Sequence, residues 1–337
     1  MKDEFDFIRA LRERAPASSS ITSIGDDAAV VRATPGKDTV ITTDLLIEDV
    51  DFRRTTISPY LLGHKALAVS LSDIAAMGSR PRWSLISIGV PADVWQTDFV
   101  DRFYSGLLEL AGHYDVQLIG GDTSRTEAKI VVDSIVLGEC AAGHAIKRSG
   151  AKPGDQIFVT GSLGAAAAGL RLVERGAHVA EQNLQGQNSQ MDSQKLDHVL
   201  LRQLRPEPRV GWGIVLGEER LATAMIDLSD GLSSDLNHLC EASGVGALIE
   251  SSLLPIDSQV TELCGRRALD PLQLALHGGE DFELLFTVRP NDVARLPRRV
   301  DETRITRIGE IQSADKSVRI SEGTRIWELN PGGWKHF

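Results

Sequence analysis

Apolar runs that end at an acidic residue recur along this chain and limit the folds that it can adopt. Five short segments share a layout in which an apolar element delivers an acid at its end or in a glycine-rich turn: "IGDDAAV", "ITTD", "LIGGDTSR", "IDLSDGL" and "HGGEDFE". Helix-length apolar-periodic stretches lie between these segments, so predicted strands and helices alternate. The pattern indicates a mixed α/β fold.

The length of the chain predicts two domains. A chain of 337 residues is long for one hydrophobic core, and both halves carry their own strands and helices. The first mixed α/β half ends near residue 145. We therefore expect an N-terminal domain over residues 1–145 and a C-terminal domain over residues 146–337.

The first half should contain three helices and several strands. We expect helices over residues 3–14, from the Ser58-Pro59 cap to near Gly78, and over "TDFVDRFYSGLLELAGHY". The expected strands are "DAAVVR", "DTVITTD", "WSLISIGV", "VQLIG" and "KIVVDSIVLGEC".

The second half is also a mixture of strands and helices, and the sequence shows no internal repeat. A strand follows the Pro-Gly turn of "KPGDQIFVTG", and the small-residue helix "AAAAGLRLVERG" follows the strand. Residues 181–194 are rich in Gln, Asn and Ser, a composition that predicts an exposed insertion. The later expected elements are a helix from Arg209, the loop "IDLSDGLSSD" leading into a helix, the strand "GALIES", and the helix, turn and strand of "LQLALHGGEDFELLFTV".

Charge and hydropathy exclude several classes of protein. The formal net charge of −11 argues against nucleic-acid binding, which depends on clustered Lys and Arg. The N-terminal "MKDEFDFIRALRERAP" interleaves charges with apolar residues and lacks the core of a secretory signal. The apolar stretch 61–77 is interrupted by His64, Lys65 and Asp73, so it should not span a membrane. We expect a cytoplasmic protein whose three separate cysteines are reduced.

The recurring acids are candidate ligands for a hard cation. Each acid alone is explained by a turn or a helix cap. The five segments, together with a sixth acid, Asp73, near the end of an otherwise apolar helix, are harder to dismiss, because Mg²⁺ binds carboxylate oxygens together with waters and substrate phosphates. Spacing does not tell whether the acids meet in space. They are Asp26, Asp27, Asp44, Asp73, Asp122, Asp227, Asp230, Glu280 and Asp281.

No familiar nucleotide-binding loop is present. The segment "GSLGAAAAGL" lacks the lysine of a P-loop, and its small residues favour helix packing over a phosphate cradle. Gly120 and Gly121 could present backbone N–H groups to a phosphate or could only turn the chain. Both readings stay open on the sequence alone.

With these residues in view, the chain resembles the thiamine-monophosphate kinases of the aminoimidazole-ribonucleotide-synthetase-like superfamily. The resemblance runs nearly end to end, and its motifs fall in family order. They are "IGDDAAV", "ITTDLLIEDVDF", "KALAVSLSDIAAMG", "LIGGDTSR", "KRSGAKPGDQIFVTGSLG", "LRPEPRV", "IDLSDGLSSD", "HGGEDFELLFTV" and the terminal "GWKHF".

The resemblance implies an activity and an assembly. Such enzymes transfer the γ-phosphoryl group of ATP to thiamine monophosphate, giving thiamine diphosphate and ADP. They are homodimers in which the N-terminal sheet is completed across the dimer, and a C-terminal α/β sandwich domain closes the active site. Thiamine monophosphate, ATP and a second copy of the chain are thus the expected partners, with neither nucleic acid nor membrane among them.

The resemblance also implies roles for individual residues. Several Mg²⁺ ions would be held by residues matching Asp27, Thr42, Thr43, Asp44, Asp73, Asp122, Asp227 and Asp230. The positions that match ATP contacts are Tyr104, Gly120, Gly121, Asp122, Arg148 and Ser229. The positions that match substrate contacts are Asp51, Glu280 and Trp334. Asp51 departs from the family, because many members have His there.

The implied chemistry explains why no general base stands out. A phosphate acceptor is already deprotonated enough to attack, so in-line positioning and charge neutralisation are the main catalytic tasks. We therefore expect no catalytic residue in the sense of an acid, base or nucleophile.

Three relatives and one other class remain as alternatives. An aminoimidazole ribonucleotide synthetase would also use acidic motifs, but "HGGEDFE" and "GWKHF" favour the thiamine branch. A selenophosphate synthetase would carry a reactive Cys near its N-terminus and a hydrogenase-maturation relative would end in Cys, whereas the first Cys here is Cys140 and the last residue is Phe337. A non-enzymatic regulator that binds metal and nucleotide would keep the acids without turnover.

Overall fold

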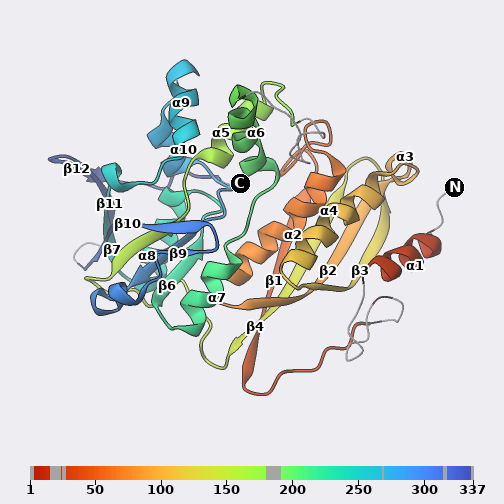
Figure 1. The fold of residues 1–337 in the computed structure, drawn as a ribbon, viewed down its shortest axis with the longest axis horizontal. Helices are drawn as coiled ribbons and strands as arrows, with labels where there is room; N and C mark the ends of the chain where they lie inside the picture. The colour runs from red at the N-terminus through yellow and green to blue at the C-terminus, as the bar shows by residue number, and fades with distance from the viewer. Residues whose placement is uncertain are drawn as a thin grey trace. The chain divides into compact units, whose positions relative to one another are not determined.

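The computed structural model describes residues 4–15, 24, 28–179, 191–267, 269–313 and 317–334. The chain divides into two compact units, one comprising Met1–Ile74 with Ser79–Gly143 and the other comprising Ala75–Gly78 with His144–Phe337. Each unit has its own sheet and helices (Figure 1). The mixed α/β fold class predicted from the sequence is confirmed.

The first unit is built on a four-stranded sheet with the order β1-β4-β2-β3. Only the β2–β3 pair is parallel. Its elements are α1 (Glu4–Arg14), β1 (Lys37–Ile47), α2 (Pro59–Ala76), β2 (Arg80–Pro91), α3 (Ala92–Trp95), α4 (Phe99–His113), β3 (Gln117–Thr126) and β4 (Val131–Ala141).

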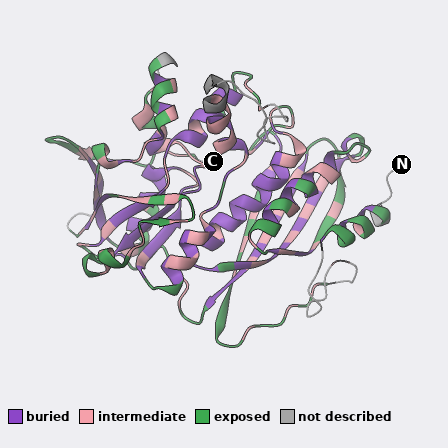
Figure 2. Cartoon of the chain, in the orientation of Figure 1, coloured by how far each residue is buried: buried purple, intermediate pink, exposed green. Residues whose placement is uncertain are grey.

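Helix α2 is the buried helix of this unit, and Figure 1 shows α2 and α4 lying across one face of the sheet. The helix begins where the Ser58 hydroxyl accepts a hydrogen bond from the Leu61 N–H at 3.3 Å and Pro59 takes the first turn. Almost all of its length is buried in Figure 2, as its apolar sequence requires. Gly63 and Gly106 allow α2 and α4 to approach closely, because a Cβ at either would collide with a backbone oxygen of the other helix.

The second unit contains an eight-stranded sheet with the order β12-β11-β7-β10-β5-β8-β6, and β9 pairs with β10 off this path. The β11–β7 pair is parallel. Its elements are β5 (Gln156–Thr160), α5 (Ala165–Val173), α6 (Met191–Leu204), α7 (Val210–Glu218), β6 (Ala222–Asp227), α8 (Leu232–Ser243), β7 (Gly246–Glu250), η2 (Ser251–Leu253), α9 (Ser258–Arg267), α10 (Pro271–His277), β8 (Leu284–Val288), η3 (Pro290–Arg295), β9 (Arg299–Val300), β10 (Thr303–Gln312), β11 (Val318–Glu322) and β12 (Arg325–Glu328).

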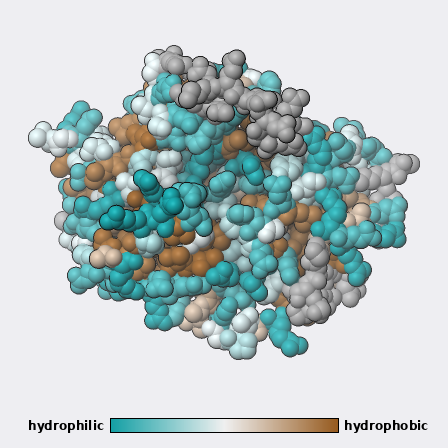
Figure 3. All heavy atoms as spheres, viewed as in Figure 1, coloured by the Kyte–Doolittle hydropathy of each residue, from teal (hydrophilic) through white to brown (hydrophobic). Residues whose placement is uncertain are grey.

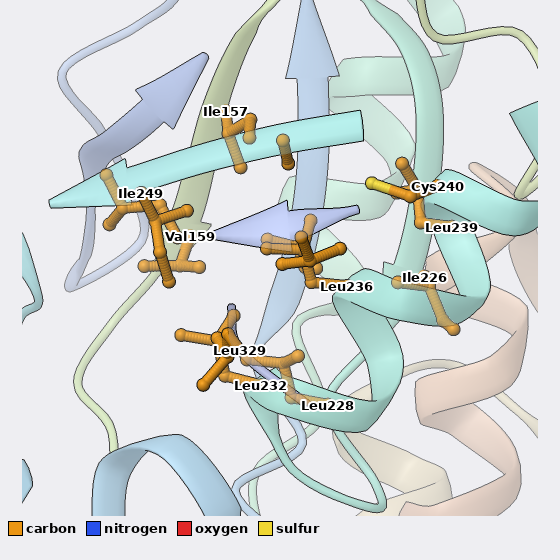
Figure 4. Close-up of a cluster of buried hydrophobic side chains, with 14 of the residues drawn as sticks. Ile157, Val159, Ile226, Leu228, Leu232, Leu236, Leu239, Cys240, Ile249 and Leu329 are labelled. Carbon is orange, nitrogen blue, oxygen red and sulfur yellow. The ribbon is translucent and has the colours of Figure 1, made fainter. Parts of the chain in front are cut away.

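The core of the second unit lies between this sheet and α8. Leu232, Leu236 and Leu239 recur at helical spacing along α8 and pack against strand residues such as Ile157 and Ile249, as Figure 4 shows. All five side chains are buried. The packing fixes the start of α8, which follows directly after the acidic loop "DLSDG".

Most elements agree with those predicted, and three points differ. The strand predicted over "DAAVVR" is wrong, because the described residues 28–32 contain no more than an isolated bridge. The strand predicted as "VQLIG" continues to Thr126. The segment predicted as an exposed insertion lies outside the described residues at 181–190, and its last four positions begin helix α6 instead.

The surface is mixed in character. On the face drawn in Figure 3, hydrophilic side chains alternate with hydrophobic patches. Within the described part of the chain, no helix combines the length and the apolar character that crossing a membrane requires.

Candidate functional site

Asp44 lies near the end of strand β1 on the side of the sheet that α2 covers. In the β1–β4 register Thr42 pairs with Val136, and Asp44 with Ser134, so these side chains share one face. The Ser70 hydroxyl of α2 donates to Asp44 Oδ2 at 2.7 Å, and the Thr42 hydroxyl donates to Asp73 of α2. The structure thus brings together Thr42, Asp44 and Asp73, three of the predicted metal ligands.

The environment of Asp44 opposes its negative charge. Burial and the neighbouring charge of Asp73 raise the pKa of Asp44 to about 6. The Ser70 hydrogen bond partly offsets this rise, and the charge of Asp133 adds to it. A cation bound here would remove the penalty, because it would compensate the carboxylates that repel one another.

The opposite face of the same sheet carries a second set of acids. The Thr43 hydroxyl donates to Asp133 Oδ1 of β4 at 2.6 Å. Ser87 of β2 pairs with both Asp133 and Asp122, so the two acids stand on strands that flank β2. The side chain of Thr43 therefore points away from Asp44, and only its backbone oxygen could join the ligands of the first set.

Gly120 and Gly121 follow a bulge in β3. The β2–β3 register passes from Ser84–Leu118 to Leu85–Gly120, which leaves Ile119 as the extra residue. Gly121 has a φ of 153°, and a Cβ there would lie 1.9 Å from the Ile86 carbonyl oxygen. Close strand packing therefore requires glycine at position 121, whatever further role its N–H group has.

These oxygen donors suit Mg²⁺ chemically. Hydroxyls hold Asp44, Asp73 and Asp133 in place, and Mg²⁺ is commonly bound by one or two carboxylates together with waters and phosphates. Within the described ranges, no three His, Cys, Asp or Glu side chains are grouped so that they could hold one ion. The arrangement fits shared coordination with a phosphate ligand better than an all-protein metal cage. Asp27 lies outside the described residues.

The acids after β1 have structural partners. Glu48 is buried, and its carboxylate accepts from Arg54 Nε at 2.8 Å and from the Ile130 N–H at 2.9 Å. Asp49 is exposed and forms an ion pair with Lys129. Asp51 Oδ2 accepts from the Ile47 N–H at 2.8 Å and closes the turn. The structure gives Asp51 this local bond, and its substrate contact stays a prediction.

Tyr104 is a core residue of the first unit. Its ring packs against Phe7 and Phe103 with centroid distances of 5.6 and 5.3 Å, and only 2% of the residue is exposed. Burial raises the pKa of its hydroxyl. The predicted ATP contact of Tyr104 stays a prediction, and the described structure shows an aromatic packing role.

The second unit gathers its acids at the start of α8. Asp227 ends β6, and Asp230 lies in the loop between β6 and α8. The sequence analysis did not single out Asp235, whose Oδ2 accepts from the N–H groups of Asp230 at 3.2 Å and Gly231 at 3.0 Å. Burial and the charges of Asp227 and Asp230 raise the pKa of Asp235 to about 8. The carboxyl group of Asp235 therefore lies close to the two predicted metal ligands, Asp227 and Asp230.

The turn that contains Glu280 lies against this acidic loop. The Glu280 N–H donates to the Ser229 carbonyl at 2.8 Å, and the Phe282 N–H donates to that of Leu228 at 2.9 Å. The Leu228 N–H in turn donates to the Glu283 carbonyl at 2.8 Å. These bonds bring together Ser229 and Glu280, a predicted ATP contact and a predicted substrate contact.

The C-terminal segment brings Trp334 to the same loop. The Trp334 N–H donates to the Asp230 carbonyl at 3.2 Å, and the Gly333 N–H donates to the Ser234 hydroxyl at 3.1 Å. A side chain at Gly333 would collide with the Asp230 carbonyl. The indole itself is 55% exposed. Trp334 and Glu280 are thus anchored to consecutive residues of one loop.

A buried ion-pair network stands behind the Glu280 turn. Glu283 is fully buried, and its carboxylate accepts hydrogen bonds from Arg209 Nε at 2.6 Å and from Arg209 Nη2 at 2.5 Å. Arg202 Nη2 donates to Glu283 Oε1 at 2.8 Å and to the Asp281 carbonyl at 3.1 Å. Burial alone would raise the pKa of Glu283, but the two guanidinium groups outweigh it and hold that pKa below its ordinary value.

The contacts of Asp281 bear on whether "GSLGAAAAGL" forms a phosphate cradle or serves helix packing. Its carboxylate accepts from the Gly164 N–H at 2.6 Å and the Ala166 N–H at 3.1 Å, at the start of α5. The carboxylate is buried and occupies the helix end that a phosphate would need. Gly169 of α5 meets the backbone of Val199 in α6, so the small residues of α5 serve helix packing.

The remaining predicted contact is Arg148, which is exposed in the second unit and whose carbonyl accepts from the Ser243 hydroxyl at 3.0 Å.

Sequence reasoning missed the residues that hold the site in place. Asp133 could have been noticed as an acid inside an apolar strand, and Asp235 as an acid in the first turn of a helix. The residues missed are Ser70, Asp133, Arg202, Gln203, Arg209, Asp235 and Glu283.

Comparisons with known proteins show the family to which the chain belongs. The AIR synthase related protein models match this chain over residues 25–140 for the N-terminal domain and 152–321 for the C-terminal domain. The thiamine-monophosphate kinase of Bacillus subtilis is 40% identical over 99% of this chain and 99% of that protein.

Solved structures give the same result. The thiamine-monophosphate kinase of Stenotrophomonas maltophilia is 36% identical, with a TM-score of 0.79 over 94% of this chain and 95% of that chain. The structure of AaThiL complexed with AMPPCP and TMP is 33% identical, with a TM-score of 0.77 over 99% of this chain and 96% of that chain. The chain therefore belongs to the thiamine-monophosphate kinase family of the AIR synthase related proteins.

Proposed function

We propose that this protein transfers the γ-phosphoryl group of ATP directly to the phosphate of thiamine monophosphate, producing thiamine diphosphate and ADP. The observation that carries the proposal is the pair Asp44 and Asp73, held side by side by hydroxyl groups in a family of thiamine-monophosphate kinases. Such a pair is unfavourable without a cation and suited to phosphate chemistry with one.

The reaction needs position and charge rather than a base. The phosphate of thiamine monophosphate is the nucleophile and attacks the γ-phosphorus of ATP, while the bond to the β-phosphate oxygen breaks. Mg²⁺, when bound, would neutralise phosphate oxygens. Several ions would bind: in the first unit the residues that would hold them are Asp27, Thr42, Thr43, Asp44, Asp73 and Asp122, and in the second unit Asp227 and Asp230 would hold an ion of their own.

ATP and the thiamine moiety would be held by other residues. For the phosphates of ATP we propose the backbone N–H groups of Gly120 and Gly121 in the first unit; Arg148 and Ser229 of the second unit stay ATP contacts that the family resemblance implies. The thiamine moiety carries a cationic thiazolium ring. The exposed Trp334 and the Glu280 carboxylate are groups that such a ring prefers, through a cation–π contact and charge attraction.

The direct test is turnover of purified protein. We expect purified protein to form thiamine diphosphate from ATP and thiamine monophosphate in the presence of Mg²⁺. Chromatography measures the product. Chelation of the metal should stop the reaction, and free thiamine should be a poor substrate because it lacks the attacking phosphate. Efficient turnover of free thiamine or of aminoimidazole precursors would contradict the proposal, and binding of ATP without any turnover would favour a regulator.

We further propose that the active protein is a homodimer formed through the first unit. Ile41 and Leu45 of β1 are 64% and 54% exposed and point to the face of the sheet opposite α2. Two apolar side chains on one exposed strand face favour burial against a second copy.

The dimer makes a measurable prediction. Sedimentation equilibrium at micromolar protein should give twice the chain mass of 36.6 kDa. Replacing Ile41 and Leu45 with Lys should yield a monomer, whereas the same change at the exposed Leu170 of α5 should not. A wild-type monomer with full activity would refute this assembly.

A further inference from the structure

The turn that carries Glu280 is conformationally strained. Glu280 has a φ of 64° and Phe282 a φ of 49°, and neither is glycine. Side chains other than glycine seldom adopt this left-handed region, and each such residue raises the energy by about 1 kcal/mol or more. Two of them within three positions persist only where surrounding contacts hold the turn firmly.

The contacts that hold the turn come from several elements. Asp281 is fixed by the first N–H groups of α5, and Glu283 by Arg202 and Arg209. The backbone at Glu280 is fixed by the Ser229 carbonyl. These anchors determine the path of the main chain, but they leave the direction of the Glu280 side chain to a separate contact.

That separate contact is made by Gln203 of α6. The Gln203 side-chain amide donates to Glu280 Oε2, and Gln203 itself is only 5% exposed. Helix α6 is held at close range by α5, since a Cβ at Gly169 would lie 2.9 Å from Gln203 Cβ and 2.3 Å from the Val199 carbonyl oxygen. The helix therefore presents the amide to Glu280 from a fixed position.

We propose that Gln203 is a positioning residue that sets the Glu280 carboxylate for the thiamine moiety of the substrate. The inference rests on the proposed function and adds to it a residue that the family resemblance did not assign. Glu280 touches the substrate in this scheme, and Gln203 acts only through Glu280.

The choice of a neutral amide supports this role. An arginine or lysine at position 203 would orient the carboxylate equally well, but it would also cancel the charge that attracts a cationic ring. An amide donor fixes one carboxylate oxygen without bringing a positive charge next to the carboxylate. The adjacent Arg202 instead binds Glu283, whose charge is needed for structure.

The test replaces Gln203 with Met, which keeps the volume and removes the donor. We expect the KM for thiamine monophosphate to rise about tenfold, equivalent to about 1.4 kcal/mol of binding free energy. The KM for ATP should stay within twofold, and so should kcat. Calorimetric binding of thiamine monophosphate in the absence of ATP should weaken by a similar factor.

The chain offers a matched control in Gln156. Its side-chain amide donates to Glu310 Oε2 at 3.0 Å, which makes the same kind of pair between β5 and β10 of the same unit. The variant Gln156→Met should leave both KM values unchanged. Circular dichroism and the unfolding midpoint should match the wild type for both variants, so that altered binding is separated from misfolding.

A double-mutant comparison distinguishes this inference from the proposed function. Glu280→Gln should also raise the KM for thiamine monophosphate, and adding Gln203→Met to it should cause no further rise, because Gln203 acts through Glu280. An additive effect of the two changes, or an unchanged KM in Gln203→Met, would overturn the positioning role even if the kinase activity is established. Absence of kinase activity in the wild type would instead overturn the proposed function, and unchanged calorimetric binding in Gln203→Met would then still overturn the positioning role.

Discussion

Replacing Arg209 with Met should lower the free energy of unfolding of the second unit by about 3–5 kcal/mol, because it removes one partner of a buried ion pair. Glu283 is fully buried and takes two hydrogen bonds from the Arg209 guanidinium group. Arg202 alone cannot replace both bonds. Guanidinium-induced unfolding, followed by tryptophan fluorescence because Trp212 is buried in this unit, measures the change.

The pH dependence of this effect has a definite sign. The pKa of Glu283 is held below 4.5 in the folded protein, so the ion pair stabilises the fold above about pH 4.5 and loses that contribution as the pH falls through the folded-state pKa. The stability gap between the wild type and Arg209→Met should therefore narrow in acid.

An exposed pair provides the control. Arg307 Nη2 lies 3.8 Å from Glu310 Oε2, and both side chains are nearly half exposed. Arg307→Met should change the free energy of unfolding by less than about 0.5 kcal/mol. If the two arginine variants lose similar stability, the buried network is not what holds the Glu280 turn.

The acids at strand ends could be predicted from the sequence because the signal is local. The strand expected to end at "ITTD" placed Asp44 on β1, although β1 continues to Ile47, and the alternation of the strand separates Thr43 from Thr42 and Asp44. The family resemblance implied an ATP contact for Ser229 and substrate contacts for Glu280 and Trp334, and the structure brings these three residues to one loop.

The partners of these residues could not be predicted because they are remote in sequence. Gln203 lies 77 positions before Glu280, and Arg209 lies 74 before Glu283. Glu48 stands among other acids in the sequence, yet it is buried and accepts hydrogen bonds from Arg54 Nε and from the Ile130 N–H. Helix α6, which carries two of the anchors, starts inside a stretch whose composition indicated an exposed insertion.

Asp281 also shows the difference between a local sequence signal and partners that are remote in sequence. In the sequence it is one more acid in a glycine-rich turn and therefore a candidate metal ligand. In the structure it caps α5, and burial together with the nearby charge of Glu283 raises its pKa to about 6 despite Arg202 and two backbone donors. A glycine-rich acidic motif thus supplies a proposed substrate contact, a helix cap and an ion-pair anchor at positions 280, 281 and 283.

Asp44→Asn should reduce kcat/KM for thiamine diphosphate formation by about 100-fold while the protein stays folded. The substitution removes one formal charge from the pair with Asp73 and keeps an oxygen that can accept from Ser70. Rate measurements across a range of Mg²⁺ concentrations check this, and a variant with near wild-type rate at low Mg²⁺ would show that Asp44 is only structural. Ser70→Ala is the companion variant, since it removes the hydrogen bond and leaves the charge, and it should cost much less activity.

Asp44→Asn should lower activity but raise the stability of the metal-free protein. The pKa of Asp44 is raised from 3.8 to about 6 in the folded protein, so its charge destabilises the fold above about pH 6 and ceases to do so as the pH falls through 6 toward 4. Metal-free Asp44→Asn should therefore melt at a higher temperature than metal-free wild type at pH 8, and the two should converge near pH 4. Mg²⁺ should raise the melting temperature of the wild type more than that of the variant at pH 8. If the variant instead melts lower at pH 8 without metal, the carboxylate is stabilised by the fold itself and the cation is not what compensates it.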